Sequence, residues 1–213
     1  DLEWGVIRCV GDPRERFGED ALRILRAIRF SAQLGYRIEE ETLEAIGELA
    51  HTLHKISEER IQTELVKLMV SPNPEYLRTA YDTGVTKVFL PEFDQCMETP
   101  QNHPHHCYSV GEHILHSVQA VEQAKVLRLA MLFHDMGKPF VETVDEKGIT
   151  HVYGHAAVSA ELAGKILRRL KFDNETIRKV SRLVLYHDYG NGIEVDRRIV
   201  RRAVHKIGEE AFA

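Results

Sequence analysis

The chain has 213 residues, of which 43% are hydrophobic and 29% are charged. This composition can supply the core of one large domain or two small ones, and it excludes an intrinsically disordered protein. A net charge of −5 argues against indiscriminate nucleic-acid binding but allows local basic patches. The longest apolar run, residues 126–133, is too short to cross a bilayer, so we expect no membrane partner.

The cysteines and the chain ends bear on the source of the protein. Cys9, Cys96 and Cys107 are scattered and odd in number, which favours a reducing cytoplasm. No charged leader precedes an apolar stretch, so no signal peptide is expected. Because the chain starts at Asp1 and stops at Ala213 just after a helical pattern, we expect it to be a fragment of a longer protein.

The first half of the chain has helical periodicity. After the turn signal at residues 11–13, apolar residues recur at helical spacing from residue 19 until Gly35. Two more helices are expected over 39–51 and 58–70, the second being ended by prolines that follow it. We assign residues 1–97 to a first helical domain.

The second half begins after a proline-containing linker, residues 98–106. A small hairpin is expected over 141–153. Further helices are expected over 109–124, 125–136, 155–170, 175–186 and 197–207. The prediction is therefore an all-α fold in two parts that join near residue 100, with a second domain over 98–213.

A histidine and an aspartate, His134 and Asp135, follow the strongly apolar helical run 127–133. Such a helix must be buried, and an unpaired charge at its end would be costly. A divalent metal satisfies imidazole and carboxylate at once, and nitrogen with oxygen ligands suits Zn, Mn, Fe or Ni. An antiparallel bundle can bring three more histidines to the same place, namely His113, His155 and His187.

Each of these histidines alone is better explained as a hydrogen-bonded residue at the edge of a core. The set, with its adjacent carboxylate and with Lys138 just beyond, favours a metal site. We leave a structural or solvent-exposed role to the other histidines of this half, namely His103, His105, His106, His116, His151 and His205. For the three linker histidines, His103, His105 and His106, a role as extra ligands is the alternative.

The order of these motifs resembles the HD phosphohydrolase superfamily. The resemblance is carried by His113, the run from His134 to Pro139, the run Tyr153-Gly154-His155, and His187. In that family such residues hold one or two divalent metals, here Mn, Ni, Mg, Fe or Zn, and a bound water attacks a phosphoester. The resemblance implies metal ligation by His113, His134, Asp135, His155, His187 and Asp188, and catalytic roles for His134, Asp135 and Lys138. Lys138 would meet a phosphate oxygen, although a solvated helix-end lysine is the alternative.

The sequence does not decide which carboxylate is the last ligand of the metal site. Asp188 is the first candidate and Asp196 a weaker one. Close relatives carry an aspartate in a helix further downstream. If that residue is the ligand, it lies beyond Ala213 and the site of this chain is incomplete.

A second candidate site lies near the N-terminus. On one continuous helix, Arg16, Asp20 and Arg23 would share a face, since residues three and four apart are neighbours. A carboxylate beside a guanidinium can meet the Watson–Crick edge of a base. An ordinary surface ion pair is the alternative.

The surrounding sequence resembles the neck of class II tRNA nucleotidyltransferases, the CCA-adding and poly(A) polymerase family. The matching segments are 11–17, 19–23, 26–30, 35–36 and 58–65. The resemblance implies that Asp20 and Arg23 select ATP or CTP, and that the parent protein acts on the 3′ end of tRNA or another RNA. The catalytic head of that family would precede Asp1, so no nucleotidyl transfer is expected from this chain. Whether the parent adds CCA, A alone or a longer tail is left open.

A basic stripe is predicted on the last helix, at Arg197, Arg198, Arg201, Arg202 and His205. It could follow an RNA backbone or be a solvated helix face.

Our leading hypothesis is a neck and HD fragment that hydrolyses 2′,3′-cyclic phosphates, 2′-nucleotides or RNA 3′ ends. The alternatives are a non-catalytic RNA-docking or dimerising module and a free-standing HD nucleotide hydrolase. A homodimer is left open.

Overall fold

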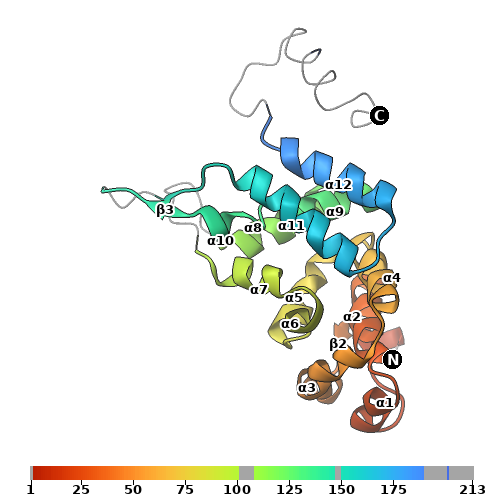
Figure 1. The fold of residues 1–213 in the computed structure, drawn as a ribbon. Coiled ribbons are helices and arrows are strands. Elements are labelled where there is room, and N and C mark those ends of the chain that lie inside the picture. Colours follow the sequence, from red (N-terminus) through yellow and green to blue (C-terminus); the bar gives the residue numbers. More distant parts are fainter. Residues whose placement is uncertain (1, 101–107, 147–149, 190–200, 202–213) are drawn as a thin grey trace.

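The computed structural model describes residues 2–100, 108–146, 150–189 and 201 (Figure 1). The regular secondary structure of this part of the chain is almost entirely helical, which confirms the predicted all-α class. Its strands are two short pairs, each two residues long. None of the described helices has the length and hydrophobicity needed to cross a membrane.

The first half is built from short helices around a long central one, α2. Its helices are α1 (Pro13–Glu19), α2 (Leu22–Leu34), α3 (Glu40–Leu49), α4 (Glu58–Met69), α5 (Leu77–Asp82), α6 (Thr86–Phe89) and α7 (Pro91–Glu98). Turns of 3₁₀ helix span Leu2–Trp4, Ala50–Lys55 and Pro74–Tyr76. The parallel strands β1 (Val6–Ile7) and β2 (Arg37–Ile38) pair across α2 in sequence, with Val6 opposite Arg37.

The helix expected from residue 19 is interrupted at Asp20. Asp20 has extended backbone angles, φ −150° and ψ 102°, and its Oδ1 accepts a hydrogen bond from the Leu22 N–H at 3.1 Å. A short carboxylate competes in this way for backbone donors, so it ends α1 and begins α2. The prediction that Arg16, Asp20 and Arg23 share one helical face is therefore wrong.

The second half is a helical bundle with a small hairpin. Its helices are α8 (Val110–Ala120), α9 (Lys125–Phe133), α10 (Lys138–Val141), α11 (His155–Arg169) and α12 (Asn174–Tyr186). Antiparallel strands β3 (Thr143–Val144) and β4 (Thr150–His151) confirm the predicted hairpin. Helix α9 ends three residues earlier than expected. The predicted helix 197–207 lies outside the described residues apart from Arg201.

One continuous core joins the two halves. It runs from Phe17 to Val184 and includes Phe93 and Phe133, whose side chains are fully buried. Helix α8 packs on α7 and on the 3₁₀ turn Pro74–Tyr76, and α4 contacts α9. In Figure 1 the red-to-yellow first half therefore lies directly against the green-to-blue bundle.

Candidate metal centre

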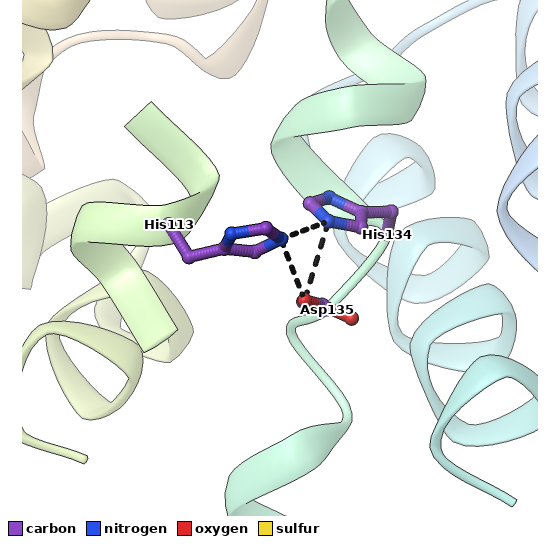
Figure 2. Close-up of side chains that lie close together, drawn as sticks. All are labelled: His113, His134 and Asp135. Atoms are coloured by element: carbon purple, nitrogen blue, oxygen red, sulfur yellow. Dashed lines mark hydrogen bonds and ion pairs between the residues drawn. The ribbon is translucent and has the colours of Figure 1, made fainter. Parts of the chain in front are cut away.

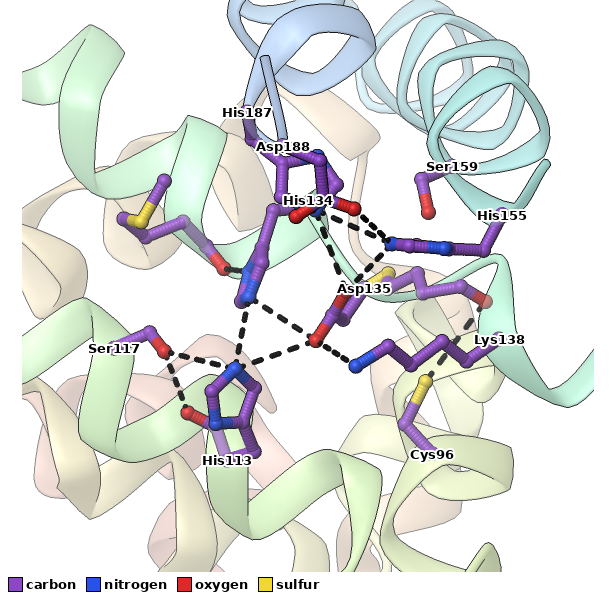
Figure 3. A network of polar contacts seen from close by, with 12 residues as sticks. Cys96, His113, Ser117, His134, Asp135, Lys138, His155, Ser159, His187 and Asp188 are labelled. Carbon is purple, nitrogen blue, oxygen red and sulfur yellow. Dashed lines mark hydrogen bonds and ion pairs between the residues drawn. The ribbon is translucent and has the colours of Figure 1, made fainter. Parts of the chain in front are cut away.

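Four elements of the second half bring the predicted ligands to one place (Figure 3). His113 is on α8, and His134 caps the C-terminus of α9, with Asp135 next in the chain. His155 is the first residue of α11, and His187 caps the C-terminus of α12. Residues that are up to 74 positions apart in sequence thus converge, as the antiparallel bundle predicted.

The first group consists of His113, His134 and Asp135 (Figure 2). The two Nε2 atoms are 3.2 Å apart. Asp135 Oδ2 lies 3.3 Å from His113 Nε2 and 3.2 Å from His134 Nε2. Three potential ligand atoms therefore face a common point.

The second group consists of Asp135, His155 and His187. His155 Nε2 lies 3.3 Å from His187 Nε2. The other carboxylate oxygen, Asp135 Oδ1, lies 3.2 Å from His155 Nε2 and 3.6 Å from His187 Nε2. Asp135 thus takes part in both groups, with one oxygen in each.

These spacings fit divalent metal ligation. A tetrahedral ion bound to imidazole at about 2.0–2.1 Å holds its ligand atoms about 3.3–3.4 Å apart. Three protein ligands per group would leave room for water or substrate, as in catalytic rather than structural sites. The donor set, two imidazoles and one carboxylate oxygen in each group, suits transition metals.

Backbone carbonyls orient three of the four imidazoles. The Nδ1 atoms of His134, His155 and His187 lie 2.7, 2.9 and 2.8 Å from the carbonyl oxygens of Met131, Val152 and Val184. A carbonyl only accepts, so each Nδ1 must carry the proton, and a neutral ring then presents the Nε2 lone pair to the centre. The sequence did not indicate this arrangement, although each carbonyl belongs to the residue three positions before its histidine.

Asp135 is almost completely buried and stays ionised. Burial acts to raise its pKa, but hydrogen bonds from His134, His155 and His187 outweigh burial, and the pKa lies well below its usual range. Lys138 Nζ also lies 2.7 Å from Asp135 Oδ2, and only 16% of the lysine side chain is exposed. The ammonium of Lys138 therefore faces the centre and pairs with a predicted ligand rather than pointing into solvent.

Asp188 lies beside the second group. Its Oδ2 is 3.2 Å from His155 Nε2, its Oδ1 is 3.4 Å from His187 Nε2, and its side chain is 46% exposed. Its position is that of a carboxylate at the open edge of the site. The weaker candidate Asp196 lies outside the described residues.

A close contact fixes the loop after Asp135 to α11. The Gly137 N–H donates to Ser159 Oγ at 2.8 Å. A Cβ on Gly137 would lie 2.5 Å from the His155 carbonyl oxygen, so only glycine fits. Sequence reasoning missed Ser159, which is fully buried one turn beyond His155.

The remaining histidines of this half behave differently. His116 is exposed and packs against Tyr108, with ring centroids 4.7 Å apart. His151 pairs with Asp145, Nε2 to Oδ2, at 3.0 Å. Several predicted residues lie outside the described part of the chain, namely the linker histidines, His205 and the basic stripe apart from Arg201. Arg201 is described, and its side chain is exposed.

At the N-terminal candidate site, Asp20 and Arg23 have separate partners. Asp20 Oδ2 pairs with Arg60 of α4 at 2.9 Å. Arg23 Nη1 pairs with Glu19 Oε2 at 2.5 Å, and Arg16 binds the same oxygen at 2.7 Å. Sequence reasoning missed the role of Arg60, because its contact joins residues 40 positions apart.

An open groove of about 420 Å³ lies beside Arg23. Four arginines line it, and Phe17, Ala27 and Phe30 contribute apolar surface. The arginines are Arg8, Arg16, Arg23 and Arg26.

Two family matches cover most of the chain. Residues 35–97 match the family described as "Probable RNA and SrmB- binding site of polymerase A". Residues 102–210, half of the chain, match the family described as "HD domain". HD domains bind divalent metals, in agreement with the two ligand groups.

Individual relatives are CC-adding and CCA-adding enzymes. The chain is 36% identical over 185 residues to the CC-adding tRNA nucleotidyltransferase of Thermus thermophilus, covering 81% of the chain and 42% of that protein. It is 55% identical over 104 residues to the CCA-adding enzyme of Pediococcus pentosaceus, covering 47% of the chain and 26% of that enzyme. The chain thus spans less than half the length of these relatives.

Solved structures agree at the level of the fold. A CCA-adding enzyme in an apo form matches with a TM-score of 0.52 and 20% identity, over 98% of this chain and 44% of that chain. A CCA-adding enzyme with ATP matches with a TM-score of 0.51 and 21% identity, over the same shares. The chain therefore belongs to the HD domain family, and its HD domain follows the neck region of a tRNA nucleotidyltransferase.

Proposed function

We propose that this chain is a metal-dependent phosphohydrolase whose two ligand groups, which share Asp135, would each hold a divalent ion. The observation that carries the proposal is the shared carboxylate, because each oxygen of Asp135 completes a group with two imidazole nitrogens. When bound, the ions would lower the pKa of a coordinated water and polarise a phosphoryl oxygen. We also infer that Asp188 is the closing carboxylate of the second group, given its distances to His155 and His187.

Each side chain has a distinct part in this proposal. His113 and His134 would hold one ion and His155 and His187 another, each through Nε2. Asp135 belongs to both groups, and its negative charge would partly neutralise the bound cations. Lys138 holds Asp135 in position at rest, and its ammonium is close enough to the centre to attract a substrate phosphate as a point charge.

The proposed substrate is a nucleotide phosphoester: a 2′,3′-cyclic phosphate, a 2′-nucleotide or an RNA 3′ end. The support is contextual, because an RNA-binding family match precedes the HD domain and the relatives act in tRNA processing. We propose residues 1–97 as the neck domain and 98–213 as the hydrolase domain, in a cytoplasmic protein.

The neck would contribute nucleotide and RNA binding. We propose that Asp20 and Arg23 read the base of ATP or CTP in the parent protein, with tRNA as its partner. The arginine-lined groove beside Arg23 supports this, since its positive charge suits a phosphate-bearing ligand. Binding a base would require Arg60 and Glu19 to share or release Asp20 and Arg23.

Hydrolysis of bis-p-nitrophenyl phosphate with added Mn²⁺ or Ni²⁺ tests the hydrolase proposal. The chain should be active, Asp135→Asn should lose at least a hundredfold in rate, and chelation should abolish activity reversibly. The matched control is His116→Ala, on the same helix as His113 but exposed, which should keep full activity. An inactive, metal-free chain would instead support a non-catalytic RNA-docking or dimerising module.

A further inference from the structure

The hairpin beside the metal centre carries an exposed aromatic ring that neither the metal ligation nor the core explains. Tyr153 is 79% exposed, although it lies only two residues before the proposed ligand His155. A single exposed apolar side chain is ordinary on a protein surface. Tyr153 differs from an ordinary exposed side chain because its ring stacks on a second ring and because it lies close in sequence to His155.

The ring of Tyr153 is held flat against a second ring. It stacks on His151 with a centroid distance of 5.2 Å and an interplanar angle of 9°. His151 is in turn fixed by Asp145, whose Oδ2 lies 3.0 Å from His151 Nε2. The ring of Tyr153 thus has one supporting contact, on His151, while most of its surface is exposed.

The backbone segment that carries this ring is joined to His155 by hydrogen bonds. His155 donates its backbone N–H and its Nδ1 proton to the same carbonyl, that of Val152, at 3.3 and 2.9 Å. Gly154, with φ +77°, makes the turn between them. Two residues of extended chain span at most about 7 Å, so the Tyr153 backbone lies within one nucleotide's reach of His155.

Other exposed aromatic side chains follow the same pattern. Phe140 is 50% exposed two residues after Lys138, and Tyr189 is 38% exposed directly after Asp188. Flat apolar faces next to a phosphoester site suit a ligand that joins a phosphate to an aromatic ring. Nucleobases stack on such side chains without regard to base identity.

We propose that Tyr153, backed by His151, is a stacking platform for the base of the nucleotide whose phosphate enters the metal centre. The inference rests on the proposed hydrolase function and identifies the feature that would favour nucleotides over other phosphoesters. Tyr153 is a specificity-determining residue here, since it contacts the base and not the reacting atoms.

Kinetics with matched substrates test the platform. Adenosine 2′,3′-cyclic phosphate, an RNA pentamer with the same end, and methyl riboside 2′,3′-cyclic phosphate differ in base and length but share the reacting group. Tyr153→Ala should raise KM for adenosine 2′,3′-cyclic phosphate about tenfold, equivalent to about 1.4 kcal/mol, with kcat little changed. KM for the base-free riboside should not change, and Tyr153→Phe should keep the wild-type values.

Two comparisons sharpen the result. Val144→Ala removes an exposed side chain from the other strand of the hairpin and should leave KM unchanged for every substrate. A larger KM effect on the pentamer than on the mononucleotide would mean that RNA ends are the preferred ligand, and the converse would mean free nucleotides. Equal effects of Tyr153→Ala on the base-free riboside and on the nucleotide would overturn the platform.

A binding measurement separates this inference from hydrolysis. The chain has one tryptophan, so Tyr153→Trp in a Trp4→Phe background places the only indole on the platform. Adenosine 2′-monophosphate should quench its fluorescence, and ribose 5-phosphate should not. If hydrolysis is absent but quenching persists, the hydrolase proposal fails alone; if hydrolysis occurs without base-dependent quenching, the platform is rejected.

Discussion

Arg29 and Glu64 form a buried ion pair between α2 and α4. Arg29 Nε lies 2.8 Å from Glu64 Oε2, and their side chains are 9% and 7% exposed. Removing one partner leaves the other charge buried, so Glu64→Ala should lower the free energy of unfolding by about 3–5 kcal/mol. The double variant Arg29→Met, Glu64→Leu should recover most of this loss. Urea unfolding followed by circular dichroism gives the comparison, and equal losses in both variants would contradict it.

Asp94 on α7 is a buried carboxyl for which no ion pair is found among the described residues. Burial raises its pKa more than the neighbouring Thr86 hydroxyl lowers it. Because the pKa of Asp94 is higher in the folded than in the unfolded chain, the folded state keeps its proton to higher pH. The free energy of unfolding therefore falls as the pH rises from about 3.9, the unfolded pKa, through the pKa of the folded state. Asp94→Asn should therefore increase the free energy of unfolding by about 1 kcal/mol at pH 7. The gain should shrink at pH 4, and a pH-independent effect on Tm would be inconsistent with this cause.

For single residues, the sequence predicted which side chains form the candidate site better than it predicted which side chains contact one another. His113, His134, Asp135, His155 and His187 could be selected because helical spacing and the His-Asp doublet limit where they can lie. The pairing of Asp20 with Arg60 and the burial of Asp94 depend on packing between helices. Nothing local in the sequence specifies those distances.

At the scale of elements, the turn between α9 and α10 is held to the start of α11 by Gly137. A methyl group there would lie 2.5 Å from the His155 carbonyl oxygen and 2.6 Å from the Ser159 backbone nitrogen. Gly137→Ala should therefore push α11 away from Asp135, weakening the second ligand group more than the first. Metal titration should show one site weakened at least tenfold while circular dichroism stays unchanged. The control is Ser117→Ala on α8, which changes a side chain near His113 in the first ligand group. Equal weakening of both metal sites by Gly137→Ala would contradict the prediction.

Helix boundaries were the least predictable elements. Periodicity located α3, α4, α8, α11 and α12 because each has an amphipathic face of several turns. It predicted one helix where the structure has α1 and α2, because a hydrophobic pattern does not show where a helix is capped. Asp20 ends α1, and its Oδ1 accepts a hydrogen bond from the Leu22 N–H. It also extended α9 through Met136, although the ligands leave the helix at His134.

At the scale of the whole molecule, Arg169 joins the HD bundle to the neck. It forms a two-pronged ion pair with Glu92, with both distances 2.8 Å, and donates to the Phe89 carbonyl at 3.1 Å. Because Arg169 is partly solvated, Glu92→Ala should cost only about 1 kcal/mol. The shared core should preserve a single unfolding transition. Two separate transitions in the urea unfolding of the wild-type chain or of the Glu92→Ala variant would show that the two halves unfold independently.

Four helices converge on Asp135, and we propose that each of its carboxylate oxygens belongs to a metal-binding group. Anomalous X-ray scattering from crystals equilibrated with Mn²⁺ tests it most directly. We predict one peak within about 2.3 Å of the Nε2 atoms of His113 and His134, and a second equally close to those of His155 and His187. In Asp135→Asn crystals both peaks should weaken or vanish. No peak at either group in the wild-type chain, or peaks unaffected by Asp135→Asn, would contradict the account.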